Sequence, residues 1–87
     1  SLIKKHGYAE INSSLLAHSD TLIFDITLLR DKLSDIKMMI DIELNTDELR
    51  HLKYSHDEVQ STIKNKMHDL NRTHLLIAES TSAQLKS

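Results

Sequence analysis

Residues 22–40 read LIFDITLLRDKLSDIKMMI, and this stretch decides the fold class. Six of its apolar residues recur at alternating intervals of four and three positions: Leu22, Ile26, Leu29, Leu33, Ile36 and Ile40. Such spacing places them on one face of an α-helix that winds around a second helix, which is the pattern of a coiled coil. With one upstream residue, the predicted oligomer seam consists of Leu15, Leu22, Ile26, Leu29, Leu33, Ile36 and Ile40.

The same spacing continues upstream from this stretch. It runs through Tyr8, Ile11, Leu15, His18 and Leu22. The two runs join through four-residue steps on both sides of Leu22, which is a stutter that locally unwinds a supercoil. We therefore predict an inner coiled-coil helix over residues 8–44. Residues 1–7 form a lead-in, where Gly7 weakens any helix by about 1 kcal/mol relative to Ala.

The heptad pattern is interrupted over residues 43–48. Asn45, followed three residues later by Glu48, matches a helix-start capping box, although Thr46 or Asp47 could cap instead. No Gly or Pro marks the break. The chain therefore either reverses into a helical hairpin or continues as one rod some 110 Å long, at about 1.5 Å per residue.

A second heptad run follows the break and predicts an outer helix over residues 45–79, with a fraying tail at residues 80–87. Its seam positions are Leu49, Leu52, His56, Val59, Ile63, Met67, Leu70, His74 and Ile77. The first helix is more apolar than the second and carries an additional stripe behind its seam, made of Phe24, Leu28, Met38 and Ile42. A helix that is apolar on two sides is buried on two sides, so we expect the second helix to cover the first.

The predicted fold class is all-α: a long heptad-repeat helix, a capped break and a second helix, assembled as a trimeric coiled coil or helical hairpin. Ile and Leu are mixed at both core positions of the first helix, which favours three strands over two. Dimers and tetramers remain open. A lone hairpin would expose the second stripe, so we expect a homo-oligomer.

Histidines and paired carboxylates suggest a response to pH. The six histidines would move the net charge from −2 to +4 if all were charged. Charging a buried seam imidazole opposes assembly in acid, whereas carboxylates four residues apart repel each other only while ionised. The alternative is that these groups are solvated or paired with basic residues. The pH-responsive candidates are His18, His56, His74, Asp25, Asp31, Asp35, Glu43 and Asp47.

Several function classes are disfavoured by composition. The chain has no Cys, no two His residues three or four positions apart and no glycine-rich phosphate loop, so we expect no metal site, no cofactor and no enzymatic activity. A net charge of −2 argues against nucleic acid as a partner. No apolar run approaches the roughly 18–20 residues of a membrane span, so we expect membrane contact only through segments outside this fragment. Asn12 and Asn71 match the N-glycosylation pattern.

The arrangement of residues 8–79 resembles the core of haemagglutinin-type viral membrane-fusion subunits. The inner helix would be Tyr8–Leu44, the reversal Glu43–Glu48 and the outer helix Leu49–Ile77. The resemblance implies a trimer on a virion envelope, facing the outside of the cell, that drives membrane fusion by forming an acid-compatible helical bundle. The alternative is a cytoplasmic coiled-coil scaffold or a subunit of a tethering complex.

Overall fold

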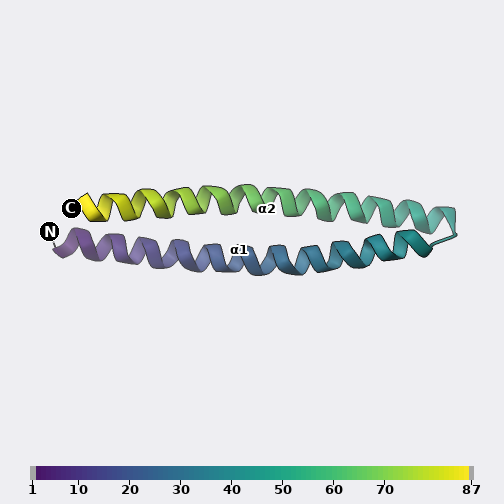
Figure 1. Cartoon of the computed structure of the whole chain (residues 1–87), viewed down its shortest axis with the longest axis horizontal. Coiled ribbons are helices and arrows are strands. Elements are labelled where there is room, and N and C mark those ends of the chain that lie inside the picture. Colours follow the sequence, from purple (N-terminus) through teal and green to yellow (C-terminus); the bar gives the residue numbers. More distant parts are fainter. Residues whose placement is uncertain (1, 87) are drawn as a thin grey trace.

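The structure, a computed structural model, describes the backbone of residues 2–86 and the side chains of residues 9–86. Helix α1 spans Leu2–Ile42, helix α2 spans Thr46–Lys86, and residues 43–45 connect them. The helices run antiparallel, so both chain ends lie at one end of a rod with extents of 66 × 14 × 13 Å (Figure 1). The prediction of an all-α helical hairpin is confirmed.

Both helices extend beyond their predicted outer boundaries. Helix α1 begins at Leu2, so residues 2–7 of the predicted lead-in are helical and Gly7 lies inside the helix. Helix α2 continues to Lys86, so residues 80–86 of the predicted tail are helical as well. The reason is that extending an existing helix adds a hydrogen bond for each residue ordered, and this offsets the cost of a single glycine.

Asn45 makes the turn between the helices. Its Oδ1 atom accepts hydrogen bonds from the backbone N–H groups of Asp47 (3.0 Å) and Glu48 (3.1 Å), and its carbonyl accepts from the N–H of Leu49 (2.9 Å). The N–H of Asn45 is bound by the Glu43 carboxylate at 2.8 Å, where the capping-box prediction places Glu48. No residue in the described chain has a positive φ. The chain therefore breaks at the predicted site through capping by Asn45, and of the two forms that the sequence leaves open it takes the hairpin.

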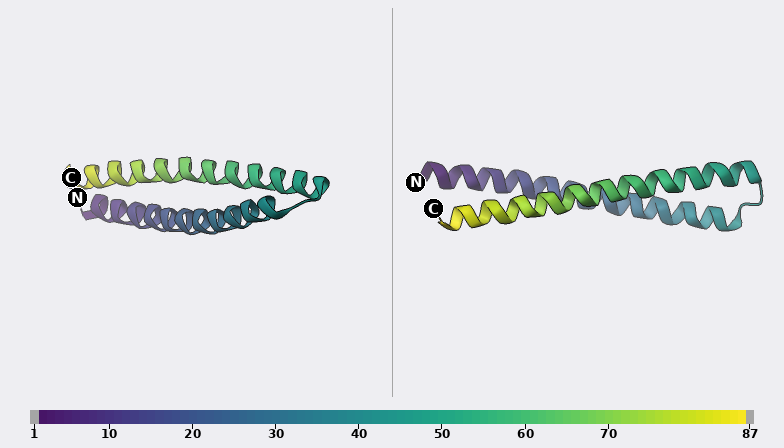
Figure 2. Two further views of the ribbon diagram at one scale, coloured as in Figure 1. Left: turned by 45° about the vertical axis from the view of Figure 1, so that its right-hand side comes forward. Right: turned by 90° about the horizontal axis from the view of Figure 1, so that it is seen from above.

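The seam between the helices runs without the predicted stutter. Positions that face the partner helix recur at intervals of three and four along all of the described α1, because Asn12 and Ser19 continue the series where Ile11 and His18 were predicted. Ile11 is 50% exposed, and His18 is exposed as well. Seen from above, the two helices cross once near the middle of the rod (Figure 2). Tyr8 lies outside the described side chains.

Helix α2 departs from its predicted seam in the same way. Lys66 and Thr73 face α1 where Met67 and His74 were predicted, and the latter two are exposed. A strict seven-residue repeat puts polar side chains at these positions. The prediction chose Met67 and His74 because they are less polar than Lys66 and Thr73. In the structure, the supercoil keeps the seven-residue repeat regular and so selects the polar residues.

The apolar core is concentrated in the half of the hairpin nearer the connection. Its buried members are Leu22, Ile26, Ile36, Leu52, Val59 and Ile63. Leu29, Leu33, Ile40 and Leu70 pack against the cluster that Ile26, Ile36, Val59 and Ile63 form. The predicted oligomer seam of α1 therefore packs on α2 within one chain. No described side chain is less than 2% exposed, because two helices enclose a single seam and leave its two edges open to solvent.

Candidate interaction surfaces

Polar side chains occupy the seam in the half nearer the chain ends. Ser19 is 4% exposed and its Oγ shares a hydrogen bond of 3.0 Å with Nε2 of His74. Thr73 is 3% exposed and its hydroxyl donates to the carbonyl of Asp69, one turn earlier in the same helix. Hydrogen bonding makes the burial of these hydroxyl groups tolerable. This half of the seam therefore gains little from apolar burial.

An ion-pair cluster lies on one flank of this polar half. Asp69 contacts Nε2 of His18 on the opposite helix and Nη2 of Arg72 on its own helix, each at 3.2 Å. The hydrogen bond from Arg72, and then that from His18, holds the pKa of Asp69 below its ordinary value, although partial burial opposes this. His18 is thus paired on the surface and does not occupy the seam.

A second ion pair bridges the helices where polar and apolar halves meet. Lys66 Nζ donates to Oδ2 of Asp25 at 3.3 Å, and both side chains are about one third exposed (33% and 38%). Asp25 is one of the pH-responsive candidates, with solvation or pairing to a basic residue as the alternative. Its basic partner comes from α2 of the same chain.

The other pH-responsive candidates are scattered along the rod. His56 lies half-buried in the seam and contacts the adjacent Asp57 at 3.2 Å. Glu43 belongs to the turn and Asp47 to the first turn of α2, so the break separates them and they do not form the predicted i, i+4 pair. Asp31 and Asp35 do lie one turn apart on α1, and both are exposed. No single cluster unites the predicted residues.

Asn12 belongs to the seam at its open end. Its Nδ2 donates to Oε1 of Gln84 at 3.3 Å, whereas its Oδ1 and the Ser80 hydroxyl are buried without a hydrogen-bond partner. An N-linked sugar would be attached to Nδ2 of Asn12, which is bonded to Gln84 between the helices. Glycosylation of Asn12 therefore requires the helices to separate at this end. Asn71 is exposed on α2.

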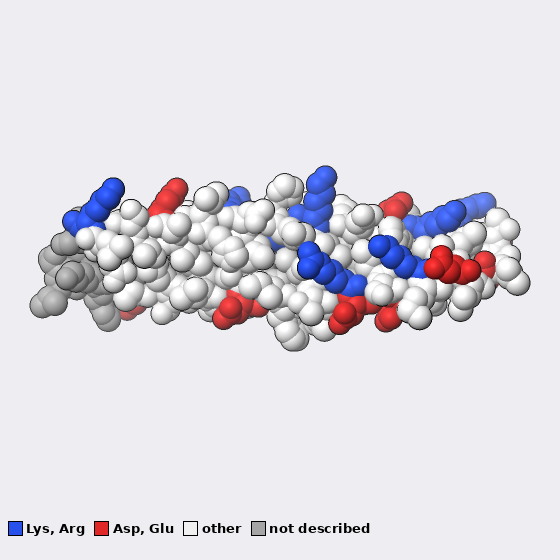
Figure 3. All heavy atoms as spheres, in the orientation of Figure 1, with Lys and Arg blue, Asp and Glu red and all other residues white. Residues whose placement is uncertain are grey.

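Shallow grooves follow the open edges of the seam. One of about 420 Å³ has Ile36, Leu52 and Val59 in its floor and the oppositely charged Lys32 and Glu58 among its lining residues. Charges of both signs are spread over the face that Figure 3 shows, with acidic side chains along the lower edge that α1 forms. The surface therefore offers no concentrated basic patch on this face.

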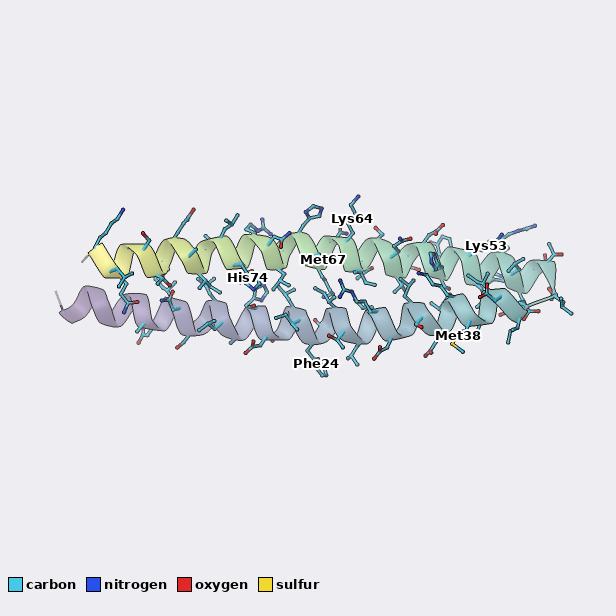
Figure 4. The ribbon with its side chains drawn as sticks, in the orientation of Figure 1. Phe24, Met38, Lys53, Lys64, Met67 and His74 are labelled. Atoms are coloured by element: carbon cyan, nitrogen blue, oxygen red, sulfur yellow. The ribbon has the colours of Figure 1, made fainter. Side chains whose placement is uncertain are left out.

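A stripe of exposed apolar side chains lies on the outer face of α1 and consists of Phe24, Leu28, Met38 and Ile42. These side chains are 63%, 53%, 64% and 79% exposed. Phe24 and Met38 project away from α2, whereas Met67 and His74 lean toward α1 (Figure 4). Asp31 and Asp35 occupy the middle of the stripe, and neither has a hydrogen-bond or ion-pair partner among the described side chains.

Sequence reasoning missed the polar residues that lie between the helices, which are Asn12, Ser19, Lys66, Asp69, Thr73 and Gln84. A signal was present, since the uninterrupted alternation of three and four residues through Asn12, Leu15 and Ser19 needs no stutter. The prediction favoured the stronger apolar character of Ile11 over the regularity of the repeat.

Among residues 9–86, no group of three His, Asp or Glu side chains could hold a metal ion. Neither helix is long and apolar enough over its described length to cross a membrane. Comparison with known protein families, curated proteins and solved structures finds no match to this chain.

Proposed function

We propose that this chain is a non-enzymatic assembly module, a helical hairpin that joins protein subunits as part of a coiled-coil scaffold or tether. The observation that carries the proposal is the exposed outer stripe of α1. Helical domains ordinarily bury each apolar stripe against another element, and α2 covers only one of the two stripes on α1. The other is available to a partner.

Pairing of whole hairpins is favoured over a trimer of α1 alone. The α1 residues that would line a three-stranded core pack on α2 of the same chain, with Ile26 and Ile36 at 5% and 7% exposure. An α1-only trimer would have to displace α2 from these residues. Hairpins that associate through their outer faces or open seam edges keep the existing core, and the four-helix bundle is the common result of such pairing.

The test is the concentration dependence of mass and helix content. We expect analytical ultracentrifugation from about 1 μM to about 1 mM to show association above the 10.0 kDa of one chain. Circular dichroism should show helix content rising with it, because partners cover apolar surface that water otherwise contacts. A chain that stays at 10.0 kDa and is fully helical at every concentration would contradict self-assembly.

The fusion-subunit core is a second candidate. The chain reversal at residues 43–45 and the antiparallel return of α2 support it, because they bring both chain ends to one end of the rod. In a fusion core this geometry would draw two membranes together on the outside of an envelope. A trimer at least as stable at about pH 5 as at about pH 7.5 would favour this candidate. An even-numbered oligomer would favour the scaffold, and a large loss of stability in acid would count against the fusion core.

A further inference from the structure

We infer that the outer stripe of α1 is the contact between two copies of this chain, and that Asp31 and Asp35 make this contact acid-dependent. The inference rests on the proposed assembly function. It adds that the partner is a second copy of the chain and that the charge of the two aspartates controls the association. It starts from the order of residues along the stripe, which is two apolar residues, two aspartates and two apolar residues, at intervals of 4, 3, 4, 3 and 4.

This order reads the same in both directions. The intervals average 3.6 residues, so the six positions form a straight line along the helix of about 27 Å, at 1.5 Å per residue. A two-fold axis between Asp31 and Asp35 would set Phe24 of one copy against Ile42 of the other, and Leu28 against Met38. A two-fold interface requires a surface that complements itself, and a palindromic stripe provides one.

The stripe is free to make this contact. Its four apolar side chains are between 53% and 79% exposed, and α2 lies on the opposite side of α1 (Figure 4). Two copies joined in this way would keep their seams intact and form a flat array of four helices in the order α2, α1, α1, α2. The contact is closed, because each copy uses the same surface, so it yields a dimer and no filament.

Charge at the centre of the stripe controls the contact. The antiparallel arrangement sets Asp31 of each copy against Asp35 of the other. Four carboxylates then meet between apolar residues, and the basic residues nearest to them in the sequence are Arg30, Lys32 and Lys37. Like charges in contact disfavour the ionised form and weaken association at neutral pH. Acid removes the repulsion and leaves the apolar contacts.

Substitution of the aspartates separates this mechanism from histidine charging in acid. At about pH 7.5, D31N/D35N removes the four charges while the histidines stay as they are. We expect at least a tenfold increase in the dimerisation constant, measured by analytical ultracentrifugation. The matched control is E58Q/E79Q, which makes the same change of net charge on exposed positions of α2. An equal increase in the control would overturn the role of Asp31 and Asp35.

Apolar substitutions test the surface itself. Adding F24S/M38S to D31N/D35N should abolish the gain, whereas Y54S/L75S, at 71% and 65% exposed positions of α2, should leave it unchanged. Circular dichroism checks that each variant keeps its helix content. If the chain associates but F24S/M38S has no effect, the outer stripe is not the contact, and the proposed assembly function survives.

Cysteine cross-linking tests the two-fold geometry, because the chain has no cysteine of its own. In the D31N/D35N background we expect S34C, which lies beside the stripe and close to the axis, to give a covalent dimer with a short bismaleimide cross-linker. T27C, whose two copies would lie about 18 Å apart along the helices, should give none. Efficient linking through T27C would overturn the antiparallel arrangement.

Absence of self-association is a separate outcome. A chain that stays monomeric at about pH 5 and as D31N/D35N would overturn the second copy as occupant. If that chain binds a synthetic amphipathic helix with lysines opposite Asp31 and Asp35, the stripe takes a basic partner, and assembly with another protein remains the function. If it binds neither, the proposed function fails as well.

Discussion

Asn45 shows how a single side chain can reverse a chain that has no proline and only one glycine. Its amide oxygen satisfies two of the N–H groups that begin α2, and Glu43 binds its own N–H. Free N–H groups at a helix start otherwise depend on water. The side-chain oxygen of Asn45 therefore stabilises the start of α2, and this favours two helices joined by a turn over one unbroken helix.

Replacing Asn45 by Ala should destabilise the hairpin by about 1 kcal/mol, because Ala cannot accept hydrogen bonds from the N–H groups of Asp47 and Glu48. Urea unfolding followed by circular dichroism at 222 nm would measure this loss. Asn65→Ala is the control: this residue is exposed inside α2, so the change should be neutral or slightly stabilising. Equal effects at both sites would contradict the capping role.

Asp69 should make stability depend on pH. Its pKa is lowered by Arg72 and His18, so the folded state favours its ionised form. The resulting stabilisation is present above the pKa of the unfolded chain and is lost as the pH falls through the lower folded value. We expect Asp69→Asn to lower the melting temperature at about pH 7, with the difference from wild type closing below about pH 4.

Asp20→Asn provides the comparison for Asp69→Asn. Asp20 is exposed on α1, and its substitution should leave the melting temperature close to wild type across this range. A difference between wild type and Asp69→Asn that persists in acid would mean that Asp69 stabilises the hairpin by something other than its charge.

At the scale of the helix, the two halves of the seam differ in chemistry. The half near the connection buries Ile, Leu and Val, whereas the half near the chain ends buries Ser and Thr and is bridged by ion pairs. Apolar burial supplies most of the stabilisation of packed helices, and exposed ion pairs supply little. The hairpin should therefore be firmest beside its turn.

Truncation in the two halves tests this difference. Ile63→Ala removes a side chain that is 8% exposed in the apolar half, and should cost about 2 kcal/mol. Thr73→Ala removes a side chain that is 3% exposed in the polar half. It should cost less than about 1 kcal/mol, because Ala is the better helix former and the lost hydroxyl only bonds its own helix. Urea unfolding gives both values, and equal costs would contradict the division.

At the scale of the whole molecule, the hairpin is about half as long as an unbroken helix of the same sequence would be. Its radius of gyration over Cα atoms is 19.4 Å. An unbroken helix of 87 residues would be about 130 Å long, with a radius of gyration nearly twice as large. The hairpin and the unbroken helix can use the same seam residues. In the hairpin these residues join the two helices of one chain, and in the unbroken form they would join two chains.

Small-angle scattering of the dilute chain at neutral pH should give a radius of gyration close to 19.4 Å. Replacing Glu43, Leu44 and Asn45 by Ala should raise it, because this removes the cap and favours an unbroken helix. Equally large values for both chains would contradict the hairpin as the monomeric form.

The sequence by itself determined the helical class and the site of the break, and it offered Asn45 as one of three capping residues, since spacing and capping act within a few residues of each other. It also determined the apolar seam from Leu22 to Ile40, where the repeat and the hydrophobicity agree. Nearer the chain ends the heptad repeat and the hydrophobicity of the residues disagree, and only the tertiary structure decided the register there. Packing against the partner helix keeps the repeat regular. Ser19 and Thr73 are therefore buried, and His18 and His74 are not. The pairing of Asp25 with Lys66 and of His18 with Asp69 likewise depends on the alignment of two distant segments, which no local pattern contains.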